Sequence, residues 1–131
     1  MNNTSSASSE DTTDWDAEFD LIAVGSGCGG MTAALTAHAQ GLKALILEKT
    51  DRIGGSTAIS GGALWLPLND RSREAGQPDD YARVWTYLQA TVGEAAPEAM
   101  RKAFLDAAPA ALRFMEQHSE LRVTPRALSP D

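Results

Sequence analysis

The chain has 131 residues, enough for one domain, and 18 acidic against 11 basic side chains give it a formal net charge of −7. This charge argues against partners such as nucleic acid or an anionic membrane surface, and no apolar run approaches membrane-spanning length. No basic segment followed by an apolar one marks a secretory signal, and the single cysteine excludes an internal disulfide, so a cytoplasmic location is expected.

The first segment is rich in Ser, Thr and Asn, holds many of the surplus acids and has few apolar side chains. A segment of this composition buries too little apolar surface to offset the entropy of ordering. We therefore predict a disordered acidic tail over residues 1–17 and a folded segment over residues 18–131.

The most informative motif begins after the apolar run of residues 19–24, which reads as a buried strand. It is Gly25-Ser26-Gly27-Cys28-Gly29-Gly30, with the spacing G-x-G-x-x-G. The first glycine permits a tight turn, the second a close approach of the backbone to a pyrophosphate, and the third close packing of helix on strand. The N–H groups and the dipole of a helix N-terminus would attract the phosphates.

A helix is predicted over residues 31–40, which are rich in alanine, and Gly41 is placed to end it in a left-handed conformation. A second apolar strand, residues 43–48, ends in Glu48, and we expect parallel strands covered on both faces. Glu48 is suited to accept hydrogen bonds from ribose hydroxyls and would repel a 2′-phosphate. A bare glycine turn is a common feature, but this order of strand, turn, helix, strand and acid predicts a Rossmann-like βαβ unit that binds an adenine dinucleotide.

A second glycine-rich segment, residues 54–62, follows the acid and has two glycine pairs separated by small hydroxyl residues. Its backbone could lie against a flat ligand, which an NAD enzyme does not generally need at this point. The predicted cofactor contacts are Gly25, Ser26, Gly27, Cys28, Gly29, Gly30, Glu48, Lys49, Gly54, Gly55, Ser56, Thr57, Ser60, Gly61 and Gly62.

These motifs resemble the fumarate reductase and succinate dehydrogenase flavoprotein family. The stretch from Gly54 to Pro67, with Ser-Gly-Gly followed by an aliphatic residue, Trp and Pro, is most similar to its 3-ketosteroid Δ1-dehydrogenase branch. The resemblance implies FAD as cofactor and a small apolar ketone, such as a 3-ketosteroid, as substrate. It implies removal of hydrogens next to the ketone with hydride transfer to FAD. Because no histidine lies between Gly54 and Gly62, noncovalent FAD is expected.

Members of that family are several times longer than this chain, so we expect an N-terminal, incomplete part of a doubly wound FAD-binding domain whose partner is the remainder of the flavoprotein. The tyrosines Tyr81 and Tyr87 match no catalytic tyrosine of the branch, so no catalytic residue is assigned, and no metal site is predicted. Two alternatives stay open. One is a fumarate-reductase-like flavoprotein, and the other is a non-catalytic, truncated nucleotide-binding fragment.

The other candidate side chains have simpler interpretations. Cys28 would start a helix, where a thiolate is favoured, but without a partner cysteine we interpret it as a turn residue. His38 is interpreted as a surface residue, and His118 as the end of a helix where a cation suits the dipole. Trp65 is either a core anchor or part of the lining of a flat substrate site.

The second half of the chain is predicted to be helical. A loop is expected over residues 68–79, then a helix over residues 81–91 that is capped by Asp79 or Asp80 and ended by Gly93. Another helix begins at Pro97 and continues to His118, restarted or kinked at Pro109. Helical spacing predicts core positions at Tyr81, Val84, Trp85, Leu88, Val92, Met100, Phe104, Leu105 and Ala108.

Overall fold

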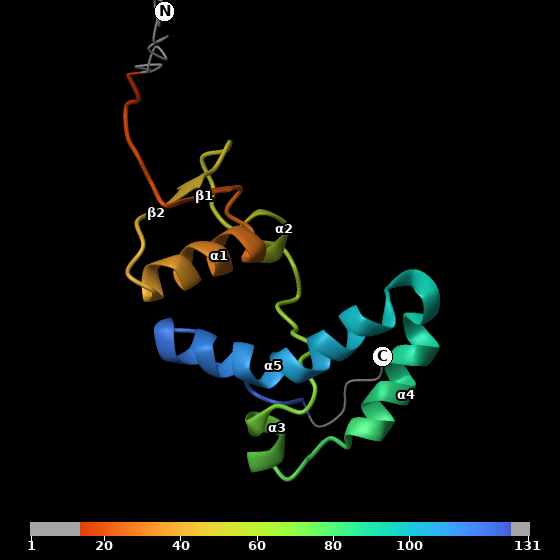
Figure 1. Cartoon of the computed structure of the whole chain (residues 1–131). Helices are drawn as coiled ribbons and strands as arrows, with labels where there is room; N and C mark the ends of the chain where they lie inside the picture. The colour runs from red at the N-terminus through yellow and green to blue at the C-terminus, as the bar shows by residue number, and fades with distance from the viewer. Residues whose placement is uncertain (1–13, 127–131) are drawn as a thin grey trace, which may run out of the picture.

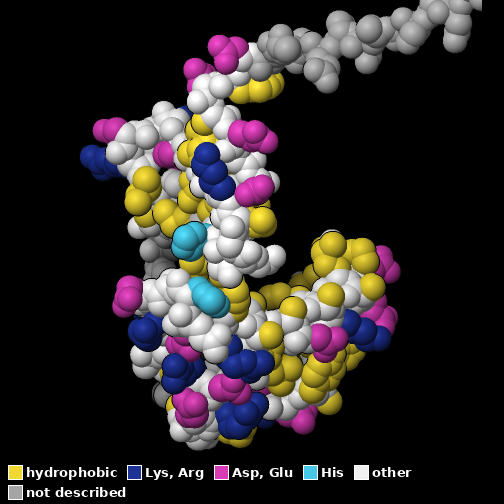
Figure 2. Space-filling view, turned by 60° about the vertical axis from the view of Figure 1, so that its left-hand side comes forward, with side chains coloured by type: hydrophobic (Ala, Val, Ile, Leu, Met, Phe, Trp, Pro, Cys, Tyr) yellow, Lys and Arg dark blue, Asp and Glu magenta, His cyan; other side chains and the backbone are white. Residues whose placement is uncertain are grey.

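A computed structural model describes residues 14–126, so most of the predicted disordered tail lies outside the described residues. The elements are β1 (Leu21–Val24), α1 (Cys28–Ala39), β2 (Ala44–Leu47), α2 (Gly55–Ala58), α3 (Asp70–Glu74), α4 (Tyr81–Thr91), a 3-10 turn at Gly93–Ala95, and α5 (Glu98–His118). The two strands, α1 and α2 lie at one end of the molecule and α3 and α4 at the other, while α5 runs beside α1 (Figure 1). Figure 2 shows a face hollowed between the two ends, with hydrophobic side chains in the hollow.

The predicted βαβ unit is present. Strands β1 and β2 pair in parallel, with Leu21 opposite Ala44 and Val24 opposite Leu47. The ladder continues one residue further, because the N–H of Gly25 donates to the carbonyl of Leu47 at 2.7 Å. Helix α1 packs on both strands, as the crossover connection of a parallel pair requires.

The two faces of this sheet differ. Ala23 is buried beneath α1, whereas Ile22, Val24 and Leu47, which lie on the opposite face, are 53%, 87% and 49% exposed. The prediction of strands covered on both faces is therefore wrong for residues 14–126. The apolar residues of the two strands are typical of a sheet buried on both faces, but no described element covers the second face.

Helix α1 begins at Cys28, three residues before the predicted start, so the last two glycines of the motif belong to its first turn. Its C-terminus confirms the role of Gly41, whose φ is 79°. The N–H of Gly41 donates to the carbonyl of His38 at 2.9 Å and that of Leu42 to Ala37 at 3.0 Å. This pair of bonds is a Schellman motif, which satisfies carbonyls that the helix end leaves free.

The loop predicted over residues 68–79 contains the short helix α3, because the side chain of Asn69 accepts a hydrogen bond from the N–H of Ser72 at 2.9 Å and caps it. Asp80 caps α4 through the N–H of Arg83 at 3.0 Å, while Asp79 accepts from the N–H of Leu68. The sequence pattern gave no sign of α3, because one turn is too short to show an apolar period.

The core of the helical end is formed by Val84, Leu88 and Leu105, with Leu68, Trp85 and Val92 packed against it. Leu105 is only 1% exposed. Tyr81, Met100 and Phe104 were predicted to be core residues, but they are 42%, 63% and 38% exposed. Tyr81 and Met100 occur in the first turn of their helices, where the apolar period extends beyond the surface that the neighbouring helix covers.

Helix α5 runs through Pro109 from Glu98 to His118, so the helix does not restart at that residue, and a kink there stays a prediction. Proline inside a helix costs about 3 kcal/mol, because it removes an N–H donor and crowds the preceding turn. Leu105, Ala108 and Leu112 are buried along one face on both sides of the proline. Burial of that face on other elements offsets the local cost.

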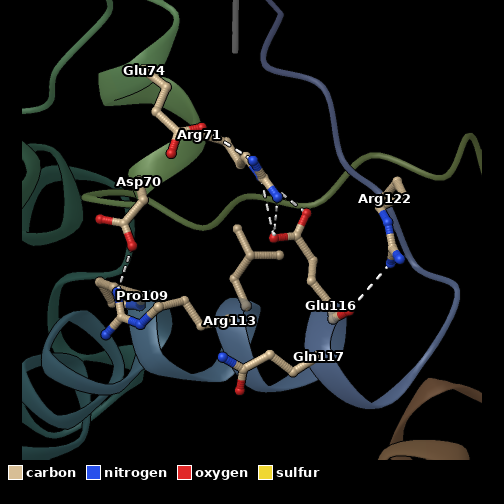
Figure 3. A pocket seen from close by; sticks show the side chains of 9 residues that line it. Asp70, Arg71, Glu74, Pro109, Arg113, Glu116, Gln117 and Arg122 are labelled. Atoms are coloured by element: carbon tan, nitrogen blue, oxygen red, sulfur yellow. Dashed lines mark hydrogen bonds and ion pairs between the residues drawn. The ribbon is translucent and has the colours of Figure 1, made fainter.

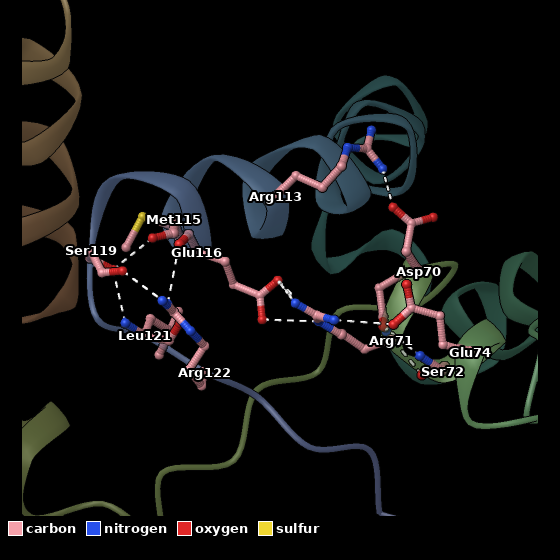
Figure 4. A network of polar contacts seen from close by, with 11 residues as sticks. Asp70, Arg71, Ser72, Glu74, Arg113, Met115, Glu116, Ser119, Leu121 and Arg122 are labelled. Atoms are coloured by element: carbon pink, nitrogen blue, oxygen red, sulfur yellow. Dashed lines mark hydrogen bonds and ion pairs between the residues drawn. The ribbon is translucent and has the colours of Figure 1, made fainter.

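Ion pairs join α3 to α5. The guanidinium of Arg71 binds both oxygens of Glu116 through Nε at 3.2 Å, and Arg113 contacts Asp70 at 2.7 Å (Figure 4). The hydrogen bond from Arg71 lowers the pKa of Glu116 below its usual range. A pocket of about 370 Å³ lies between these side chains (Figure 3). Its acids are each paired with an arginine, so we interpret the pocket as part of the joint between the two helices.

Candidate cofactor site

The first glycine segment turns the chain sharply from β1 into α1. Gly25 has a φ of 99°, a region that side-chain-bearing residues rarely adopt, and this confirms the turn predicted at the first glycine. Gly27 then occupies the N-cap position in an extended conformation, without a side chain to cap the helix. The start of α1 thus presents backbone N–H groups and no acidic residue in its first turn.

The third glycine of the motif is required by close packing. A Cβ at Gly30 would lie 2.0 Å from the carbonyl oxygen of Gly25 and 3.7 Å from the Cβ of Ala23. No side chain fits at that distance. The predicted contact of helix with strand at this position is confirmed.

Glu48 lies at the mouth of the turn. Its Oε2 accepts hydrogen bonds from the N–H of Ser26 at 3.0 Å and from the Ser26 hydroxyl at 2.6 Å. Its Oε1 accepts from the N–H and the hydroxyl of Thr50, both at 3.1 Å. These bonds lower the pKa of Glu48 to about 2, and the bond from the Ser26 hydroxyl has the largest effect. The carboxylate therefore stays ionised at neutral pH.

The second glycine segment folds back onto the first. The N–H of Gly54 donates to the Ser26 hydroxyl at 2.8 Å, and a Cβ at Gly55 would lie 3.6 Å from the Cα of Gly27. The N–H of Cys28 donates to Oγ1 of Thr57 at 3.1 Å, which joins the start of α1 to α2. The two glycine-rich segments therefore form one structure, although they are separated by more than twenty residues in the sequence.

The residues present fit a diphosphate. A Cβ at Gly29 would meet nothing within 4 Å, and one at Gly27 would meet only Oγ1 of Thr57 at 3.9 Å, so the approach to the start of α1 is open. Thr57 takes the N–H of Cys28, and the dipole and the other N–H groups of the first turn can still attract an anion. The negative charge of Glu48 beside it favours hydroxyl groups over a further phosphate.

The remaining predicted residues lie at the margin of this structure. The hydroxyl of Ser60 donates to the carbonyl of Thr57 at 2.8 Å and accepts from the N–H of Gly62 at 3.2 Å. Lys49, Ser56 and Gly61 are exposed. The sequence analysis did not name Thr50, which binds Glu48. The pattern that could have indicated it is a hydroxyl residue two positions after the acid, a spacing typical of local turns.

The other candidate side chains differ in their position. Cys28 lies within the glycine turn with its side chain exposed, whereas both tyrosines lie on α4, away from that turn. Trp65 stacks on Phe104, with ring centroids 5.8 Å apart and planes at 11°, and contacts Tyr87 at 5.5 Å. Trp65 is 42% exposed, so its ring contacts do not decide between a core anchor and the lining of a substrate site. Within residues 14–126, no group of three or more His, Cys, Asp or Glu residues could hold a metal, and no helix is long and apolar enough to cross a membrane.

Comparison with known proteins decides which dinucleotide the two glycine segments belong with. Residues 20–129 match the family model described as an FAD binding domain. The chain belongs to this family. FAD, inferred above from residues 54–62, is thereby confirmed as its cofactor.

Relatives of this FAD binding domain include the 3-oxosteroid 1-dehydrogenase of Rhodococcus opacus, which is 44% identical over 118 residues, or 90% of this chain and 23% of the relative. The 4-oxocyclohexanecarboxylate 2-dehydrogenase of Sinomonas cyclohexanicum is 40% identical over 81% of this chain and 18% of its own. The crystal structure of 3-ketosteroid Δ1-dehydrogenase from Sterolibacterium denitrificans, in complex with 1,4-androstadiene-3,17-dione, superposes with a TM-score of 0.68 and 38% identity. It covers 76% of this chain and 17% of the solved one.

These matches confirm the resemblance to the ketosteroid branch that residues 54–67 indicated. The chain spans about a fifth of the length of the relatives it matches.

Proposed function

We propose that this chain is the N-terminal, FAD-binding part of a flavoenzyme that oxidises a ring ketone, with a 3-ketosteroid as its substrate. The observation that carries the proposal is the contact of Ser26 and Glu48 at the start of α1, with the Gly54–Thr57 segment closed against it. This is a Rossmann-like arrangement, in which a glycine turn faces a diphosphate and the acid faces a ribose.

In this proposal FAD is held without a covalent bond by the two glycine segments and Glu48. The start of α1 takes the diphosphate, Glu48 takes the hydroxyls of the adenosine ribose, and the segment from Gly54 to Gly62 lies against the rest of the cofactor. FAD supplies the hydride acceptor when it is bound. This chain's own residues bind and orient it, and they exclude a 2′-phosphate through the charge of Glu48.

The substrate class follows from what the similar proteins share. Their names describe dehydrogenases of ring ketones, either a steroid or a cyclohexanecarboxylate. We place the steroid first because residues 54–67 and the greater identity both point to that branch. The monocyclic ketone is the second candidate, and the fumarate-type reaction is the third.

The experiment uses the protein expressed in full from its gene. Copurification of flavin that is released by mild denaturation supports noncovalent FAD. The flavoprotein is mixed, without oxygen, with 4-androstene-3,17-dione, 4-oxocyclohexanecarboxylate or succinate. The steroid should bleach the flavin absorbance fastest, and 1,4-androstadiene-3,17-dione should appear as its product. Bleaching by succinate alone would overturn the ketone assignment. A protein that binds NAD in place of FAD would overturn the whole proposal.

A further inference from the structure

Ser26 is the one buried polar side chain among residues 14–126, at 1% exposure. Its hydroxyl lies between two segments that are distant in the sequence. It donates to Oε2 of Glu48 at 2.6 Å and accepts from the N–H of Gly54 at 2.8 Å. The Ser26 side chain therefore joins the end of β2 to the start of the second glycine segment.

The direction of both bonds is fixed by chemistry. A backbone N–H can only donate, and an ionised carboxylate can only accept, so the single hydroxyl proton must point to Glu48. The hydroxyl has no proton left for a phosphate or a ribose. The Ser26 side chain thus cannot act as a hydrogen-bond donor to the cofactor while this arrangement holds, although the sequence suggested a direct contact.

We propose that Ser26 is a positioning residue that couples the carboxylate of Glu48 to the Gly54–Thr57 segment, so that the ribose end and the diphosphate end of the cofactor site form as one unit. This inference rests on the proposed FAD site. It deepens that proposal by assigning a structural coupling to a residue whose side chain does not itself contact the cofactor.

The surroundings of Gly54 explain why loss of the hydroxyl is costly. Gly54 is buried, so its N–H cannot bond to solvent while the segment keeps this conformation. Removing the Ser26 oxygen therefore leaves a buried N–H unpaired and takes one donor from Glu48 at the same time, which is costly on both sides.

The test uses Ser26→Ala in the protein expressed in full, with Ser119→Ala as the matched control. The Ser119 hydroxyl has the same pattern, because it donates to the carbonyl of Met115 and accepts from the N–H of Leu121, but it lies at the end of α5. Ser26→Ala should weaken FAD binding about tenfold or more, since hydrogen bonds to a charged group are among the stronger ones. Ser119→Ala should leave it unchanged.

A second measurement needs no FAD. Hydrogen exchange at the amide of Gly54 should become about tenfold faster in Ser26→Ala and stay slow in the Ser119 control, since only the former removes its acceptor. Ser26→Thr keeps the hydroxyl and, if it folds, should restore slow exchange. The double variant Ser26→Ala/Glu48→Gln should lose less FAD affinity than the product of the two single losses, because both changes act on one network.

The possible results separate the two proposals. If the wild-type protein binds no FAD, the proposed function fails. The exchange rate at Gly54 then still tests whether the Ser26 hydroxyl holds the Gly54 N–H. If FAD binds and Ser26→Ala holds it as tightly as the wild type, the coupling is refuted. Fully multiplicative losses in the double variant, or unchanged exchange at Gly54, would refute it as well.

Discussion

Thr57 lies against Cys28, and its Oγ1 accepts the backbone N–H at the start of α1 at 3.1 Å. The N-cap residue of α1 is a glycine, which has no side chain to do this. The second glycine segment therefore supplies the cap that the first one lacks. This contact ties the stability of α1 to the placement of residues that would face the cofactor.

Replacing Thr57 by valine should destabilise the protein by about 1 kcal/mol, the usual cost of losing a helix cap, because valine keeps the shape but has no acceptor. Thr57→Ser retains the hydroxyl and should fall within a few tenths of the wild type. Urea unfolding monitored by circular dichroism measures both. Equal stability of the valine and serine variants would show that the cap contributes nothing.

Gly30→Ala should destabilise the protein by about 3 kcal/mol or more, because the added methyl group would overlap the carbonyl of Gly25 and neither backbone can move freely. Gly29→Ala is the matched control on the next residue of the helix, where a Cβ would meet nothing within 4 Å. It should stabilise α1 by up to about 1 kcal/mol through helix propensity. Thermal unfolding of the two variants should move in opposite directions, and a shared direction would contradict the packing argument.

The pKa of Glu48 predicts a specific dependence of stability on pH. Its folded value of about 2 lies below the ordinary value of 4.5. Its stabilising effect is therefore complete above pH 4.5 and is lost as the pH falls through about 2. Glu48→Gln cannot titrate, so the gap in urea midpoint between the wild type and this variant should narrow steadily between those two values.

Carbon NMR of the Glu48 carboxyl group checks the same prediction directly. Its titration should be centred near pH 2 in the folded wild type. A midpoint at the ordinary value would mean that the bonds from Ser26 and Thr50 do not form in solution.

The ion pairs between α3 and α5 should differ in importance from the pair within α5. The side chain of Glu116 is 12% exposed and binds Arg71 through two oxygens, whereas the side chain of Glu98, paired with Lys102, is 58% exposed. Glu116→Gln should therefore lower the unfolding temperature more than Glu98→Gln, since exposed pairs contribute little. Differential scanning calorimetry at low and high salt compares the two variants, and an equal loss would contradict the assignment of a joint at α3.

Local chemistry explains what could be predicted along the chain. The turn at Gly25, the Schellman motif at Gly41 and the cap at Asp80 each depend on residues within one helical turn, so they can be recognised from the sequence. The order of strand, glycine turn, helix, strand and acid likewise predicted an adenine dinucleotide, and residues 54–67 carried the resemblance to the FAD family. Helix α3 was missed because it is too short to show a period. For α5 the sequence predicted the extent of the helix but left a restart at Pro109 open, and the buried face on both sides of the proline decides against it.

The sequence by itself predicted an adenine dinucleotide as cofactor and the two glycine segments that we propose to bind it, because glycine spacing and a strand-end acid are requirements of backbone geometry. Only the tertiary structure showed that Ser26 is buried between Glu48 and Gly54, that Thr57 caps α1, and that no element within residues 14–126 covers the second face of the sheet. The contacts of Ser26 and Thr57 join residues more than twenty positions apart. They depend on how parallel strands and the returning loop pack in space, which a pattern of neighbours in the chain does not encode.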